Sequence, residues 1–162
     1  MSDRAKGGAE TTLWVRTFGA AVRARGEETG GLHTVMEHVL PPGRIAMPLH
    51  RHERETETTY VLEGVLSVQL GKRVFRAGPG SCIVKPAGVF HTYWNEGERP
   101  ARFVDVVSPG GVEAYYEEVS AAIPASGVVD ISRVLEISRR HGIEFDMDSL
   151  MDIMERHRVQ LA

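Results

Sequence analysis

The chain has 162 residues, of which 42% are hydrophobic and 25% are charged, and its formal net charge is −3 at pH 7. This length corresponds to about one domain, which can bury a core without disulfide bonds. The charge argues against nucleic acid and membrane partners, which require a basic surface. With one cysteine, no leader-like start and no long apolar run, the protein is expected in the cytoplasm.

Residues 1–10 are polar and contain glycine, which predicts a flexible N-terminal tail. From residue 11 to residue 109, short segments rich in Val, Ile, Leu and Phe alternate with Gly, Pro and Asn turns. Expected strands include 11–15, 33–40, 58–62, 66–70, 73–76, 81–84 and 101–107. This pattern predicts an all-β sandwich or barrel. Cys82 is expected to be a buried residue of one of these strands.

After residue 110 the spacing of apolar residues changes to three and four, which is typical of helices. The first expected helix spans 112–123. A second begins after Asp130, which would cap it, and ends at Gly142. A third spans 148–158. Ile131, Val134 and Leu135 are expected on the inner face of the second helix. The third helix carries an apolar stripe that is expected in the core or at a dimer contact: Met147, Leu150, Met151 and Met154. Residues 110–162 are thus a predicted helical extension, packed on the barrel or at a homodimer interface.

Three histidines and a glutamate have the spacing of a metal site. His50 and His52 are two residues apart, so on a strand both side chains leave the same face. Glu57 is an odd number of residues further on and needs a bend at residues 53–56 to face the same way. His91, from a distant strand, would complete the set. Glu55 is the rival to Glu57, but it is expected to face solvent.

Imidazole and carboxylate ligands favour a divalent transition metal over Mg or Ca. We therefore expect one such ion per subunit, which could be Fe, Mn, Ni, Co, Cu or Zn. An isolated histidine is more often a hydrogen-bonded core or surface residue. It is the recurrence of these residue types at regular spacing in two segments that predicts a metal site.

The two segments resemble the two motifs of the cupin superfamily. Gly43, His50, His52, Glu57 and Gly64 match the first motif, and Gly80, Pro86, Gly88, His91 and Asn95 match the second at every spacing. Six residues rather than five separate Gly43 from His50, so the loop before the first ligand strand is one residue longer. The resemblance covers roughly residues 11–145. This part of the chain resembles the small single-barrel cupins that are often compared to quercetin dioxygenases.

The resemblance implies a double-stranded β-helix, the jelly-roll barrel of cupins, followed by C-terminal α-helices. It also implies metal ligation by His50, His52, Glu57 and His91. The expected activity is that of a dioxygenase-type oxidoreductase on a small hydrophobic or aromatic enol-type substrate, with Glu57 as a catalytic proton acceptor. Two alternatives remain: a non-oxidative metal-dependent cyclase, isomerase or decarboxylase, and a small-molecule-binding cupin without turnover.

Strand alternation suggests further residues of the substrate pocket. Tyr93 has the parity of His91 and would point inward. Met36, His38 and Phe103 would also face the interior, and for all of these residues ordinary core packing is the better interpretation. Trp94 has the opposite parity and is expected on the outer face of the barrel, under a helix or at a subunit contact.

Overall fold

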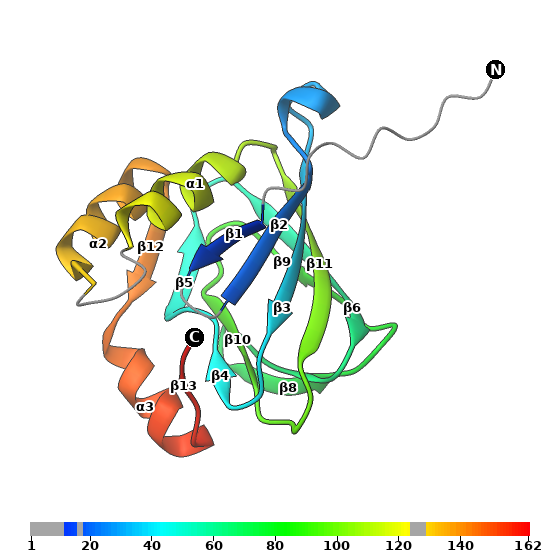
Figure 1. Cartoon of the computed structure of the whole chain (residues 1–162), viewed down its shortest axis with the longest axis vertical. Helices are drawn as coiled ribbons and strands as arrows, with labels where there is room; N and C mark the ends of the chain where they lie inside the picture. Colours follow the sequence, from blue (N-terminus) through cyan, green and yellow to red (C-terminus); the bar gives the residue numbers. More distant parts are fainter. Residues whose placement is uncertain (1–11, 16–17, 124–128) are drawn as a thin grey trace.

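The computed structural model describes residues 12–15, 18–123 and 129–162, so the predicted tail at 1–10 lies outside the described residues. These residues form a run of strands and then a C-terminal part with the three predicted α-helices, to which two short strands are added (Figure 1). The strands are β1 (Thr12–Val15), β2 (Phe18–Ala24), β3 (Thr34–Leu40), β4 (Arg44–Ile45), β5 (Leu49–His52), β6 (Thr56–Glu63), β7 (Leu66–Leu70), β8 (Arg73–Ala77), β9 (Cys82–Lys85), β10 (His91–Asn95), β11 (Ala101–Ser108), β12 (Ile143–Asp146) and β13 (Gln160–Leu161). The helices are the 3-10 turn η1 (Glu27–Thr29), α1 (Glu113–Ala122), α2 (Ile131–Arg140) and α3 (Asp148–His157).

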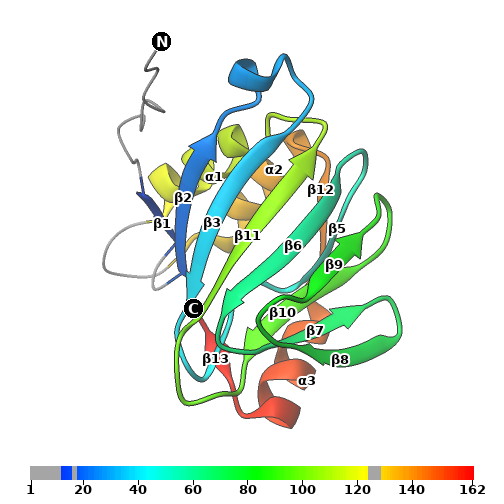
Figure 2. The same cartoon turned by 90° about the vertical axis from the view of Figure 1, so that its right-hand side faces the viewer.

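The strands form two sheets with the cupin jelly-roll arrangement. One sheet has the order β1-β2-β3-β11-β6-β9, seen side by side in Figure 2. The other has the order β12-β5-β10-β4-β13, and the β7–β8 hairpin joins it at β10. Their inner faces share one apolar core, to which α1 and α2 add Tyr115, Val119 and Ile137. Among the described residues, no helix is long and apolar enough to cross a membrane.

The turn between β6 and β7 depends on a glycine. Gly64 has a positive φ of 73°, and a Cβ atom there would lie 2.6 Å from the carbonyl oxygen of Pro100. A side chain would therefore be strained and would also collide with backbone. Gly80 has a similar φ of 85°, but its Cβ would meet nothing within 4 Å.

We expect Gly64→Ala to lower the free energy of unfolding by about 2 kcal/mol or more. In the matched variant Gly80→Ala, the free energy of unfolding should fall only by the cost of the left-handed conformation, about 1–2 kcal/mol. Urea unfolding of both variants measures the difference. Equal losses would contradict the steric argument for Gly64.

The C-terminal region contains two strands that were not predicted. β12 pairs with β5 along its whole length, and β13 pairs in parallel with β4. Each is short and lies next to a helix, so neither shows a long alternating pattern in the sequence. Both add to the sheet that carries three of the four predicted metal ligands.

The predicted inner face of α2 was partly wrong, and only part of the apolar stripe on α3 lies in the core of the subunit. In α2, Ile131 is 45% exposed, because the buried face is centred further along the helix, on Ile137. In α3, Met151 is 69% exposed, whereas Leu150 and Ile153 are buried. The buried face includes Leu150 and Ile153, and at about 100° per residue Met151 points roughly 160° away from Ile153. Asp130 does cap α2, and its side chain accepts a hydrogen bond from the Arg133 amide.

Trp94 lies where its parity predicted. It is fully buried on the outer side of β10, in a second apolar cluster with Ile45 and residues of the C-terminal segment: Leu150, Ile153 and Val159. Cys82 was wrongly predicted to be buried. It is exposed, because Ile83 and Lys85 are the inward-facing residues of β9.

Candidate metal centre

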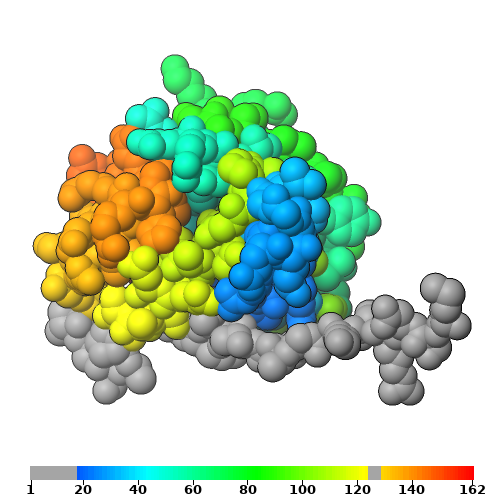
Figure 3. Space-filling view, turned by 90° about the horizontal axis from the view of Figure 1, so that it is seen from above, coloured from blue at the N-terminus to red at the C-terminus, as the bar shows by residue number. Residues whose placement is uncertain are grey.

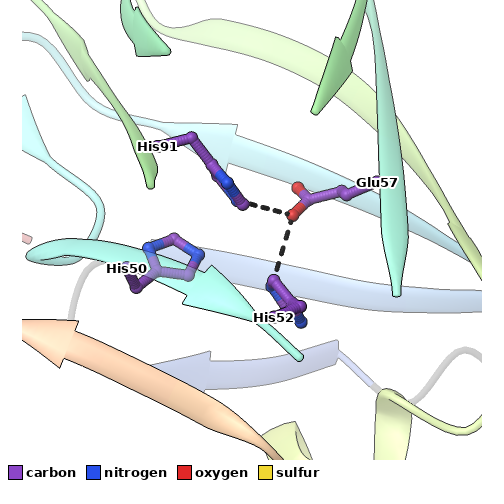
Figure 4. Close-up of side chains that lie close together, drawn as sticks. All are labelled: His50, His52, Glu57 and His91. Atoms are coloured by element: carbon purple, nitrogen blue, oxygen red, sulfur yellow. Dashed lines mark hydrogen bonds and ion pairs between the residues drawn. The ribbon is translucent and has the colours of Figure 1, made fainter. Parts of the chain in front are cut away.

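The structure brings together the four residues predicted as metal ligands. His50 and His52 lie on β5, Glu57 on β6 and His91 on β10 (Figure 4). Each is at most 5% exposed. One ligand atom from each residue can be chosen so that all four atoms lie within 4.8 Å of one another. We refer to these residues as the four-residue cluster.

Strand register accounts for this convergence. His91 lies directly opposite His50 in the antiparallel pair of β5 and β10, and their ring centroids are 4.4 Å apart. His52 follows on the same face of β5. The strand ends at His52, and β6 begins at Thr56, so the break at residues 53–55 turns Glu57 inward as the parity argument required.

The histidine rings are held so that one nitrogen of each remains for a ligand. The Nδ1 atom of His50 lies 3.0 Å from the carbonyl oxygen of Pro48, and that of His91 lies 3.0 Å from the carbonyl oxygen of Val89. Each Nδ1–H can therefore donate a hydrogen bond to a backbone carbonyl. In the neutral ring, Nε2 then keeps an unshared electron pair that can bind a metal. Metal-binding histidines are commonly oriented in this way.

The carboxylate of Glu57 faces the histidines through one oxygen. Oε2 lies 3.2 Å from His91 Nε2 and 3.6 Å from His52 Nε2. Burial acts to raise the pKa of Glu57, but the Lys85 ammonium and the nearby His91 ring outweigh it and hold the pKa well below its usual value. Burial lowers the pKa of His50 well below its usual value, and the neighbouring histidines add to this effect. Glu57 is thus charged and His50 neutral at neutral pH, the forms in which both bind metals.

Glu55 was wrongly expected to face solvent. It is 9% exposed, and its Oε2 atom lies 3.7 Å from His52 Nδ1. Within the described parts of the chain, neither atom has a hydrogen-bond partner. Burial acts to raise the pKa of Glu55, but the nearby His52 ring is among the effects that outweigh it and lower the pKa. Glu55 is therefore placed to orient His52, as the backbone carbonyls orient the other two rings.

We expect Glu55→Gln to weaken metal binding about tenfold, because loss of such an orienting carboxylate typically costs 10–100-fold. Competition between the protein and a chelator for Co²⁺ measures the dissociation constant. Glu53→Gln, at an exposed position in the same turn, is the matched control and should bind like the wild type. Equal affinities in the two variants would show that Glu55 does not orient His52.

The predicted pocket residues all lie inside the barrel. Met36, His38, Tyr93 and Phe103 are each at most 2% exposed. His38 stacks on Phe103 at 5.1 Å, and Tyr93 packs edge-on against Phe103 at 4.9 Å. None of the four lines either of the two cavities described below. Their contact with a substrate stays a prediction, as do the homodimer and the cytoplasmic location.

An apolar cavity of about 150 Å³ lies between the barrel and the C-terminal segment. Phe145, Met47 and Tyr116 contribute to its walls. Phe145 is the register partner of His50 across β12 and β5, and the two rings are 5.5 Å apart. The cavity and the four-residue cluster therefore share a wall. Among the described residues, no charged side chain lines this cavity.

A second cavity, of about 120 Å³, is polar and borders His52. Its walls come from three segments: the turn after β5 with Glu55, residues 110–112, and the end of α2 with Arg140. Viewed from above, these segments lie side by side, coloured cyan, yellow-green and orange (Figure 3). The four-residue cluster thus has a polar cavity on one side and an apolar cavity on another.

Residues 36–107 match the family model of the cupin domain. The match covers less than half of the chain and agrees with the jelly-roll arrangement of the two sheets. No curated protein sequence matches the chain significantly.

Several solved structures share the fold. KdgF from Halomonas sp. has a TM-score of 0.57 at 22% identity, over 64% of this chain and 90% of that chain. A predicted oxalate decarboxylase from Thermotoga maritima has a TM-score of 0.57 at 21% identity, over 67% and 99%. The polyketide cyclase RemF from Streptomyces resistomycificus has a TM-score of 0.56 at 22% identity, over 67% and 80%. At these identities the likeness shows the fold alone.

Sequence reasoning missed two charged residues next to the cluster. Lys85 and Asp105 are each 1% exposed, and Lys85 forms an ion pair with Glu57. The alternation of β9 could have revealed Lys85, because it shares the inward face with Ile83. The alternation of β11 could likewise have revealed Asp105, because it shares the inward face with Phe103.

Proposed function

We propose that this protein is a metal-dependent cupin enzyme of the dioxygenase type, acting on a small hydrophobic or aromatic enol-type substrate. His50, His52, Glu57 and His91 would hold one divalent transition metal ion. The observation that carries the proposal is the apolar cavity beside this cluster, with Phe145 as the shared wall. Such a cavity suits a planar apolar molecule better than a sugar phosphate.

The metal, when bound, supplies Lewis acidity to an enol oxygen and, if redox-active, a path for electrons to dioxygen. The chain supplies the remaining functions. The ionised Glu57 carboxylate points Oε2 into the cluster and can accept the proton of an enol held there. Burial raises the pKa of Tyr116 well above its usual value, so its hydroxyl stays a neutral hydrogen-bond donor on the cavity wall. The apolar walls exclude water from the substrate.

A non-oxidative reaction is the second candidate. The same four ligands and the same apolar cavity would suit a cyclase acting on an aromatic or polyketide-like substrate, and RemF, a polyketide cyclase, shares the fold. Such a reaction needs the metal only as a Lewis acid. Dioxygen consumption is therefore the property that separates the two candidates.

The test is turnover of a panel of flavonols, 1,3-diketones and catechols by the metal-loaded protein. An oxygen electrode records uptake, and mass spectrometry of products formed under ¹⁸O₂ counts the oxygen atoms gained. Uptake of one O₂ per product, with both labelled atoms incorporated, is the expected result. Product formation without oxygen uptake would instead support the non-oxidative enzyme. Binding without any product would support a binding protein and reject both reactions.

A further inference from the structure

Three buried charges lie in a row beside the metal cluster. The ammonium of Lys85 forms a hydrogen-bonded ion pair with Glu57 Oε1 and lies 3.6 Å from Asp105 Oδ1. It also lies 4.9 Å above the centre of the Tyr93 ring. Lys85 and Asp105 are 1% exposed and Glu57 is 5% exposed. Isolated charges at such depth are strongly disfavoured, so each depends on its neighbours.

Strand register creates this row. Lys85 on β9 is paired directly with Glu57 on β6, and Asp105 on β11 is paired directly with Thr59, two residues along β6. The side chains of residues 57 and 59 share the inner face of β6. The three strands therefore place the lysine between two carboxylates, independently of any ligand.

Asp105 is hydrogen-bonded through one oxygen and lies close to a histidine with the other, which has no hydrogen-bond partner among the described residues. Its Oδ1 atom accepts a hydrogen bond from the Thr59 hydroxyl, and its Oδ2 atom lies 3.2 Å from His38 Nε2. His38 is in turn stacked on Phe18 and Phe103. The carboxylate that steadies Lys85 is thus fixed by the packed core of the barrel.

The two oxygens of Glu57 have different surroundings. Oε1 is bound to Lys85, whereas Oε2 faces His52 and His91. A carboxylate without such a contact can offer a metal one oxygen or both. Here the ammonium occupies one of them.

We propose that Lys85, anchored by Asp105, is a positioning residue that holds Glu57 through Oε1 and leaves only Oε2 for the metal. The lysine also places a positive charge beside the cation site. The inference rests on the proposed metal site but does not depend on which reaction the protein catalyses.

The test uses Co²⁺, whose visible absorption reports the number and arrangement of donor atoms. In Lys85→Met, Oε1 is released, and the orientation of Glu57 is no longer fixed. We expect the visible spectrum of bound Co²⁺ to change and its dissociation constant to rise about tenfold or more. Lys72→Met, at an exposed lysine, is the matched control and should leave both unchanged.

A second variant covers the case in which Lys85→Met does not fold. Asp105→Asn keeps the size of the side chain and can still accept from Thr59, but it removes the charge that anchors the lysine. It should change the Co²⁺ spectrum in the same direction by a smaller amount. Circular dichroism of each variant confirms that it is folded before Co²⁺ is added.

The results distinguish a wrong role for Lys85 from the absence of a metal site. Folded variants with the wild-type spectrum and affinity would overturn the role of Lys85, whatever their thermal stability, because a merely structural residue leaves the metal spectrum unchanged. Failure of the wild-type protein to bind Co²⁺ would reject the metal site and, with it, the inference. A changed spectrum in Lys85→Met with an unchanged one in Lys72→Met supports it.

Discussion

The double variant His50→Ala/His91→Ala is expected to lose metal binding by about a thousandfold or more. A four-ligand zinc site contributes roughly 10–16 kcal/mol, and loss of about 4 kcal/mol already corresponds to a thousandfold in affinity. The two histidines face each other across β5 and β10, so their removal opens one side of the cluster. The wild-type protein should carry about one equivalent of a transition metal per subunit.

Elemental mass spectrometry of untagged protein, followed by Co²⁺ titration of the metal-free form, measures both quantities. The matched control is His33→Ala/His141→Ala, which removes two histidines outside the cluster. It should retain the wild-type metal content. Metal retained by His50→Ala/His91→Ala at wild-type affinity would show that the cluster is not the binding site.

The metal used by the cell decides how the proposed function is tested next. Iron, manganese, cobalt, nickel or copper would favour the oxygen-uptake assays, whereas zinc would favour the non-oxidative reaction because it has no redox chemistry. The ligand types alone do not separate these ions. Glu57 serves in either case, since its role as proton acceptor depends on its charge and position.

The predictions that succeeded rest on local alternation. Parity along a strand places His50 with His52, and it sends Trp94 to the side opposite His91. The break that turns Glu57 inward was predictable from the polar residues before it. Each of these statements concerns side chains a few residues apart, where the period of a strand is sufficient.

The predictions that failed depend on contacts between distant segments. A lysine in a strand is ordinarily expected to face solvent. Only the pairing of β9 with β6, and of β6 with β11, places Lys85 between two carboxylates. The position of Glu55 also depends on distant segments, since it lies beside His52 and lines a polar cavity together with residues 110–112 and the end of α2. Strand β12 forms because β5 offers it an unpaired edge, which no local pattern reveals.

The C-terminal segment is expected to be part of the folding core, so Ile153→Ala should lower the free energy of unfolding by about 2–5 kcal/mol. Ile153 is 4% exposed and packs in the cluster around Trp94 and Ile45. Met151→Ala, on the exposed side of the same helix, should change it by no more than about 0.5 kcal/mol.

Urea unfolding followed by tryptophan fluorescence measures both values, since Trp94 lies in the affected cluster. The coupling extends toward the metal site, because β13 pairs with β4 and β4 with β10, the strand that carries His91. A single transition that moves to lower urea in Ile153→Ala is therefore expected. If Ile153→Ala instead unfolds like Met151→Ala, α3 is an appendage that the barrel does not need, and the last residues of the chain contribute nothing to the position of His91.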